Sequence, residues 1–293
     1  MNPRAADGFA EAVDAADAIH ARVVASTVHE PPPRPHPVRR RFVGVSTAAG
    51  VALAAAAVTA FLTIGSSGTG PGPANAAAAV RKAVTVTAAS AERSGTAVVT
   101  ITHGGGTWAT KTVRWNGDDV EIDGDATPRS LLVVDGMMYA PDPEGPGWIE
   151  LGPPQSIDPG SGTTPAEYLA AVREDVGGVT LRRITDGMRG LTSASLDDGS
   201  TVYRGTVASG LIARESGFKE GHAIRVLPFG YVAHDEAADA SSQLDTSITV
   251  GVGGAISVIA VSWGTWRYTV TYSGLGSTPA PVAPPHAKPL RRG

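Results

Sequence analysis

A stretch of 23 residues without charge or proline constrains this chain more than any other feature: FVGVSTAAGVALAAAAVTAFLTI, residues 42–64. At a rise of about 1.5 Å per residue, a helix of this length reaches about 35 Å, which is enough to cross a hydrocarbon core of about 30 Å. A helix buried in a globular core would normally show a polar stripe, whereas this stretch has only scattered serine and threonine. We therefore expect a transmembrane helix over 42–64.

A cleaved signal peptide is the alternative interpretation of the same stretch. Ala74-Asn75-Ala76 has the small-x-small form of a cleavage site. However, the apolar run is longer than a usual h-region, and the 41 residues before it would make an unusual n-region. These lengths favour an uncleaved anchor.

The basic residues that flank 42–64 are unevenly distributed. Arg39, Arg40 and Arg41 stand immediately before the stretch, and the first basic residues after it are Arg81 and Lys82. Because cationic flanks resist translocation, we expect 1–41 to lie in the cytoplasm and the rest of the chain outside. The protein would then be a single-pass protein of the cell membrane with an extracytoplasmic main domain.

Composition and motifs exclude several classes of function. The formal net charge of −4 offers no electrostatic footprint for nucleic acid. Cysteine is absent, so no disulfide, thiol nucleophile or acylated lipobox cysteine is possible. The chain has no G-x-S-x-G nucleophile elbow and no Walker A loop, and its seven histidines are scattered singly. We expect no catalytic residue, no metal site and no cofactor, and hence no enzyme.

Five segments follow from the pattern along the chain. Residues 1–41 form a short cytoplasmic segment that could contact a protein partner, and 42–64 is the transmembrane helix. Residues 65–73 (GSSGTGPGP) are a flexible linker by composition. We expect an extracytoplasmic domain over 74–278, followed by a proline-rich, disordered tail over 279–293.

The domain is predicted to be α+β. Its first segment, 74–91, is rich in alanine and favours a helix, and from Ser94 the apolar period changes to two, which is typical of strands. Thr164-Pro165-Ala166-Glu167 is a capping box that predicts a second helix, over 164–176. Val179–Ile184 is interpreted as a strand. We expect a curled antiparallel half-barrel of roughly ten strands, covered by these two helices.

A curled sheet under helices leaves an apolar groove between its two layers, and the inward-facing alternate residues should line it. The residues that we expect in this groove are Val99, Ile101, Val113, Val120, Ile122, Val133, Met138, Tyr203, Val207, Val258 and Val270, with Leu169 and Val172 from the second helix.

The order of these segments resembles the LolA-like superfamily, and within it the LppX/LprG-type lipoproteins, over roughly 74–287. The passages that carry the resemblance are GTWATKTVRWNGDDVEI, VVDGMMYAPD with GWIEL, STVYRGTV and TVTYSGLGSTPAPVAPP. The resemblance implies a domain that binds a lipid or lipopeptide in its groove. This chain departs from the family because a transmembrane helix stands where the acylated cysteine would be.

A regulatory role is the alternative function. RseB-type regulators of anti-sigma factors share the superfamily fold, so the resemblance also implies an envelope-stress sensor acting through protein contacts. In that case residues 1–41 would contact a partner connected with a sigma factor.

Overall fold

The computed structural model describes residues 73–124, 130–142, 145–156, 165–215, 223–233 and 242–290. All of them belong to one compact unit, which spans 68–158 and 162–292. The cytoplasmic segment 1–41, the transmembrane helix 42–64 and the linker up to residue 72 lie outside the described residues. No helix in the described ranges is both long and apolar enough to cross a membrane.

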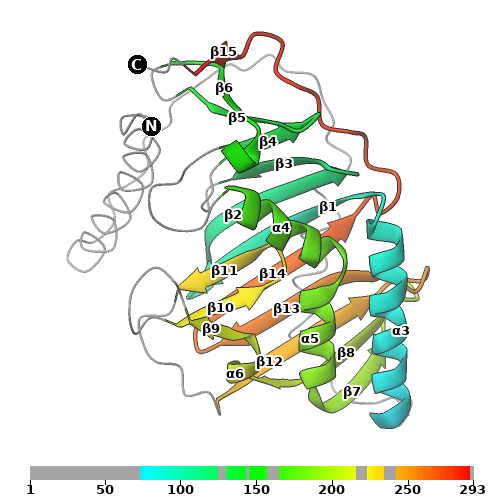
Figure 1. Cartoon of the computed structure of the whole chain (residues 1–293). Helices are drawn as coiled ribbons and strands as arrows, with labels where there is room; N and C mark the ends of the chain where they lie inside the picture. The colour runs from blue at the N-terminus through cyan, green and yellow to red at the C-terminus, as the bar shows by residue number, and fades with distance from the viewer. Residues whose placement is uncertain are drawn as a thin grey trace, which may run out of the picture. The chain divides into compact units, whose positions relative to one another are not determined.

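The largest feature of the described residues is one sheet of 12 strands, which curls and does not close (Figure 1). Its strands are β1 (Ser94–His103), β2 (Gly106–Asn116), β3 (Asp119–Gly124), β4 (Ser130–Val134), β5 (Met137–Pro141), β6 (Trp148–Gly152), β7 (Arg189–Ser195), β8 (Thr201–Ala208), β12 (Gln243–Val250), β13 (Ile256–Trp263), β14 (Trp266–Ser273) and β15 (Lys288–Pro289). Their order across the sheet is β15-β6-β5-β4-β3-β2-β1-β14-β13-β12-β8-β7.

The strands are antiparallel throughout this sheet, except for the short pairing of β15 with β6. Burial alternates along them: in β1, Ala97, Val99 and Ile101 are buried, and Val98 and Thr100 between them are half-buried. The predicted α+β class and the curled, mainly antiparallel sheet are therefore confirmed. The expected strand count of roughly ten is too low, because the C-terminal tail and the region after β8 add strands.

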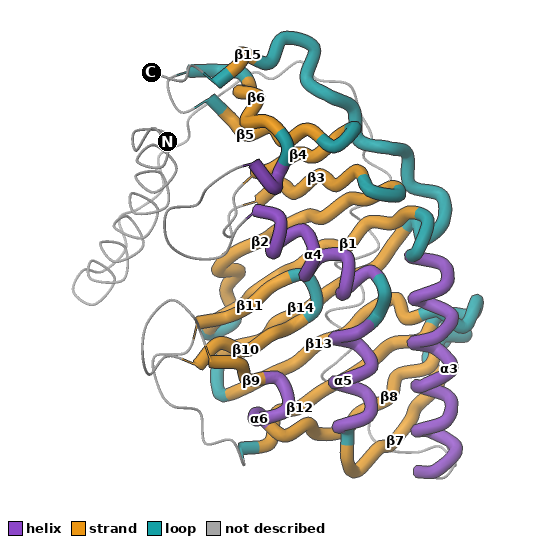
Figure 2. The backbone as a smooth tube through the Cα atoms, viewed as in Figure 1, coloured by secondary structure: helices purple, strands orange, loops and turns teal. Residues whose placement is uncertain are grey.

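Three helices cover one face of the large sheet (Figures 1 and 2). They are α3 (Pro73–Ala91), α4 (Pro165–Val176) and α5 (Val179–Gly187). A short 3-10 helix, η2 (Pro154–Ser156), precedes α4. The first two helices match the expected ranges closely.

The interpretation of 179–184 as a strand is wrong, because these residues begin α5. Leu181 and Ile184 are buried three residues apart, whereas Arg182 is exposed, as on a helix with one buried side. Gly178 lies between α4 and α5 in the left-handed region, at φ 73°. A β-carbon there would approach the Ala88 side chain to 3.2 Å, so the turn that separates the two helices needs glycine.

A second, three-stranded sheet lies over the same face as the helices (Figure 1). It consists of β9 (Ala213–Glu215), β10 (Ala223–Leu227) and β11 (Gly230–Ala233), and the short helix α6 (Ser209–Ile212) leads into it. The sequence left this region unassigned, because its pattern of charges and glycines has no clear period.

The prediction of a disordered tail over 279–293 is corrected by the residues up to 290. Lys288 pairs with Ile149 in β6, and the Leu290 N–H donates to the Glu150 carbonyl at 3.1 Å. Before this pairing, Ala283 and Ala287 pack on the outer face of the sheet, against Leu132, Val134 and Tyr139. All four residues of Leu131–Val134 are apolar, so both faces of β4 need a cover, and the tail supplies the outer one.

Candidate functional site

The helix-covered face of the large sheet is apolar and closely packed. Of the residues expected to line a groove, ten are buried in its core: Val99, Ile101, Val113, Ile122, Val133, Met138, Leu169, Tyr203, Val207 and Val270. Two more, Val120 and Val172, are buried in the core and also border an open pocket. Most of the expected groove is therefore filled by side chains of this chain.

Val258 is the exception, and its assignment to the inner face is corrected. It pairs with Thr271, whose neighbours Val270 and Tyr272 point inward, so Val258 lies on the outer face. An irregularity in the pairing of β12 with β13 follows Thr249, and Ile256 rather than Val258 enters the core. A bulge changes the face on which later residues point, and alternation in the sequence cannot reveal it.

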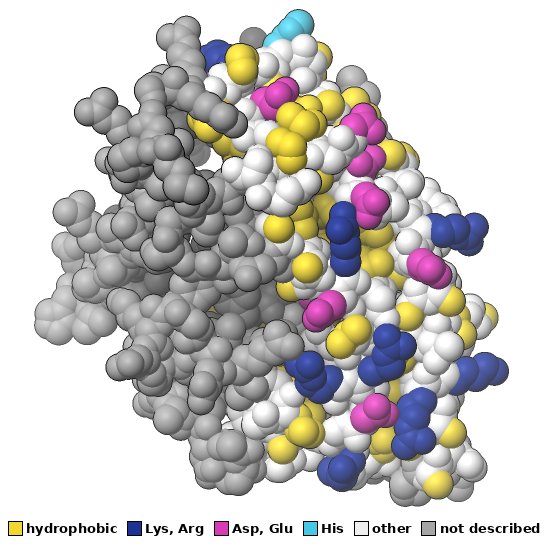
Figure 3. Space-filling model, in the orientation of Figure 1, with side chains coloured by type: hydrophobic (Ala, Val, Ile, Leu, Met, Phe, Trp, Pro, Cys, Tyr) yellow, Lys and Arg dark blue, Asp and Glu magenta, His cyan; other side chains and the backbone are white. Residues whose placement is uncertain are grey.

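An open pocket of about 610 Å³ lies where the C-terminal halves of α3 and α4 approach the β2–β3 hairpin. Its walls are mainly apolar, with Ala88 and Ala89 from α3, Trp115 and Val120 from the hairpin, and Val172 and Val176 from α4. The space-filling view shows apolar side chains beside charged ones on this helix-bearing side (Figure 3). A pocket of this size and lining is typical of a site for a small, largely apolar ligand.

Charged side chains stand at the rim of the pocket. Arg173 of α4 pairs with Asp118 of the β2–β3 hairpin at 3.0 Å, and both side chains are more than half exposed. Arg182 of α5 donates to the Gly177 carbonyl at 2.6 Å, and Glu92 stands at the end of α3. The Arg173–Asp118 pair joins α4 to the hairpin, and because it is exposed it is a weak connection.

Two ionisable groups are buried between the sheet and the helices, and one of them, Asp175, lies between the pocket residues Val172 and Val176 of α4. Lys111 lies on the inner face of β2, 3% exposed, and Asp175 lies on α4, 8% exposed. Burial raises the pKa of Asp175 from 3.8 to about 6, against hydrogen bonds from the Thr180 hydroxyl and the Phe229 N–H that favour the carboxylate. Burial lowers the pKa of Lys111 from 10.5 to about 8, against the attraction of the Asp175 charge.

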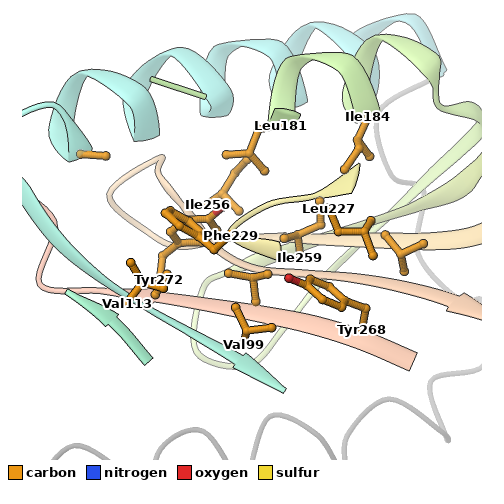
Figure 4. Close-up of a cluster of buried hydrophobic side chains, with 14 of the residues drawn as sticks. Val99, Val113, Leu181, Ile184, Leu227, Phe229, Ile256, Ile259, Tyr268 and Tyr272 are labelled. Carbon is orange, nitrogen blue, oxygen red and sulfur yellow. The ribbon is translucent and has the colours of Figure 1, made fainter. Parts of the chain in front are cut away.

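Aromatic side chains complete this interior. Trp115 donates its ring N–H to the Ala91 carbonyl at 2.7 Å, which ties β2 to the end of α3. Phe229, in the turn between β10 and β11, stacks on Trp115 with ring centroids 5.4 Å apart. It also meets the edge of Tyr272, at 5.9 Å. Figure 4 shows Phe229 between the helices and the sheet, near Tyr272, Val113 and Ile256.

Sequence reasoning missed these polar and aromatic residues of the site. Alternation could have found Lys111, since Ala109, Lys111, Val113 and Trp115 share one strand face. No local signal marks Asp175 as buried, because it belongs to a run of charged residues in the last turn of α4, Arg173-Glu174-Asp175. Phe229 could not be placed, because its region had no assigned structure. Within the described residues, no cluster of histidine, aspartate and glutamate is arranged to hold a metal ion.

Comparisons with known proteins add little to this geometry. No protein-family model and no curated protein matches the sequence. LprF from Mycobacterium bovis is 15% identical, with a TM-score of 0.44 over 75% of this chain and 99% of that one. The Mycobacterium tuberculosis lipoprotein LppX is 13% identical, with a TM-score of 0.41 over 72% and 98%. A LolA superfamily protein from Nitrosomonas europaea is 11% identical, with a TM-score of 0.23 over 70% and 94%. All three TM-scores are below 0.5.

Proposed function

We propose that this chain is a membrane-anchored, extracytoplasmic protein that binds an acyl chain of a lipid or lipopeptide. The acyl chain would lie in the pocket between α3, α4 and the β2–β3 hairpin. The observation that carries the proposal is the pocket itself, about 610 Å³ with apolar walls and an opening to solvent.

The chemistry of the pocket suits an amphiphile better than a polar metabolite. Its walls offer apolar side chains, and its charged groups are confined to the rim, where Arg173 and Arg182 can meet an anionic head group. Burial contributes about 0.8 kcal/mol per methylene, so ten buried methylenes contribute about 8 kcal/mol. This exceeds the lower estimates for the cost of association, about 4 kcal/mol.

The first prediction concerns a variant in which a large side chain on α3 fills the pocket. Ala89 is exposed and borders the pocket, so Ala89→Trp places a large ring in it without disturbing the core. We expect the amount of lipid retained per mole of full-length protein to fall by a factor of about ten or more relative to wild type, because the ring occupies the space of the buried methylenes. Mass spectrometry of co-purified lipids measures this ratio.

Ala78→Trp is the matched control for this experiment. Ala78 is exposed, lies eleven residues earlier on nearly the same side of α3, and does not border the pocket. Lipid retention should therefore equal that of wild type. Equal losses from both variants, or no lipid on the wild-type chain, would refute binding in this pocket.

The second prediction concerns the membrane anchor, which rests on 42–64 and on Arg39–Arg41. A phosphatase that is active only outside the cytoplasm, fused after Gly293, should be active, because the basic flank holds the N-terminus inside. Replacing the three arginines with glutamates should reduce that activity. A silent wild-type fusion, with a cytoplasmic reporter active at the same position, would disprove the orientation.

A further inference from the structure

The turn between β10 and β11 inserts an aromatic ring into the interior beside the pocket. Phe229 is only 1% exposed and belongs to the same apolar core as the helices and the sheet. It stacks on Trp115, and Trp115 also borders the pocket. The Phe229 N–H donates to Asp175 at 2.7 Å, and Asp175 lies on α4 between two pocket residues, Val172 and Val176. The Phe229 ring and the pocket therefore both lie beside Trp115 and α4.

The turn that carries this ring is separate from the large sheet. Strands β9, β10 and β11 hydrogen-bond with one another in their own sheet. Within the described residues, hydrogen bonds from the Phe229 N–H to Asp175 at 2.7 Å and from the Tyr268 hydroxyl to the Pro228 carbonyl at 2.8 Å join the turn to the rest of the domain. The ring can therefore leave the interior without breaking a strand pairing of the large sheet.

The backbone at Phe229 is strained. Its φ is 61°, in the left-handed region that a bulky side chain rarely adopts. Strain of this kind persists only where surrounding contacts maintain it, and here they are the two aromatic contacts and the two hydrogen bonds. A competing apolar group that takes over the aromatic contacts would release the strain.

We propose that the space now filled by Phe229 is the inner subsite of the acyl-chain pocket, and that the ring is its resident occupant. A ligand chain that enters past Trp115 displaces the ring and takes its contacts with Trp115 and Tyr272. The ligand class is a single extended acyl chain, because the ring that it replaces contacts two aromatic side chains, Trp115 and Tyr272, and Trp115 also borders the pocket. This inference rests on the proposed function and adds the exchange of an internal aromatic group for ligand.

The absence of cysteine from the chain makes a direct test possible. Pro228→Cys places the only thiol beside Phe229, at a buried position, and keeps the carbonyl that accepts the Tyr268 hydrogen bond. In the full-length chain this thiol should react slowly with a maleimide. Burial of the Phe229 side chain favours the inserted turn over the displaced turn by about tenfold or more. Saturating palmitic acid, which takes the place of the ring, should therefore accelerate labelling at least about tenfold.

Ile248→Cys is the control thiol, on β12 in the apolar core at a position 0% exposed. Palmitic acid should leave its labelling unchanged or slower, because only unfolding exposes this position. One outcome separates the two proposals: palmitic acid leaves the thiol at 228 protected, whereas Ala89→Trp still lowers the amount of lipid retained by the full chain. That outcome would refute displacement of the Phe229 ring and would support binding in the pocket. If no lipid or palmitic acid binds at all, both proposals fall together.

A matched pair of variants tests the hydrogen bond without removing the ring. In the Pro228→Cys chain, Tyr268→Phe deletes the hydroxyl that holds the turn, so ligand-free labelling should rise by about threefold to tenfold. Tyr139→Phe is the matched control, because it deletes a tyrosine hydroxyl on β5, in an apolar cluster separate from the one that contains Phe229. Its labelling should stay within about twofold of the parent. Equal responses from the two variants would overturn the proposed holding contact.

Discussion

Replacing Trp115 with alanine is expected to lower the free energy of unfolding by about 3–5 kcal/mol, the usual range for a fully buried aromatic side chain. Trp115 is 1% exposed, donates to the Ala91 carbonyl and stacks on Phe229. Its removal leaves a cavity between the sheet and α3, and it leaves that carbonyl without the indole donor. Chemical denaturation followed by circular dichroism measures the change.

A double-mutant cycle with Gly95 makes this prediction specific to the ring. A β-carbon at Gly95 would overlap the Trp115 ring, approaching Cη2 to 2.8 Å, and would lie 2.9 Å from Leu275 Cδ2. Gly95→Ala should therefore cost about 1–3 kcal/mol in the wild-type chain, and clearly less when Trp115 is alanine. If the two changes simply add, the ring does not occupy the space beside Gly95.

The pH dependence of stability should carry the signature of Asp175. Its pKa is raised by burial to about 6 in the folded protein and returns to near 3.8 on unfolding. Between about pH 4 and pH 6 the folded state therefore binds a proton that the unfolded chain has released. Stability should fall as the pH rises through this window, by about 3 kcal/mol in total, since one pKa unit corresponds to about 1.36 kcal/mol.

Asp175→Asn should abolish this slope, because the amide does not titrate. The difference in unfolding free energy between wild type and variant should change by about 3 kcal/mol from pH 4 to pH 7 and stay constant above that. Asp186→Asn, at a carboxylate 63% exposed on α5, should track the wild type to within about 0.5 kcal/mol. Parallel curves for wild type and Asp175→Asn would show that burial does not raise the pKa of Asp175 in the folded protein.

Lys111 should act in a different pH window. Its pKa is lowered to about 8, so the unfolded chain binds more protons than the folded one between about pH 8 and 10.5. The stability cost of the buried ammonium is therefore present below pH 8 and fades as the pH rises through this range. The windows of the two groups do not overlap, so a single pH titration separates them.

Local pattern was sufficient for the elements whose signals lie in neighbouring residues. The change of period at Ser94 located the start of the strands, and proline at the first helical position located the start of α4. Alternation in the strands, and the apolar stripe of the second helix, also placed most of the candidate residues on the inner face, among them Val120 and Val172 at the pocket. These features depend on side chains a few residues apart, so they can be inferred without the fold.

The same reasoning failed where a distant segment decides the outcome. Val179–Ile184 suits a strand or a helix by composition, and burial against α3 and the sheet selects the helix. The tail up to residue 290 is ordered because β6 offers an open edge and β4 an apolar outer face. Neither partner is near in the sequence.

The sequence by itself therefore determined the α+β class, the antiparallel meander and the inward face of most strands, because these follow from local period and turn chemistry. Only the tertiary structure decided what fills the space under the helices. Lys111 and Asp175 are 64 residues apart in the chain, and Asp175 and Phe229 are 54 apart, so no local pattern links them. The three residues meet because the apolar face of the curled sheet must be covered, and the chain covers it with α4 and the β10–β11 turn together.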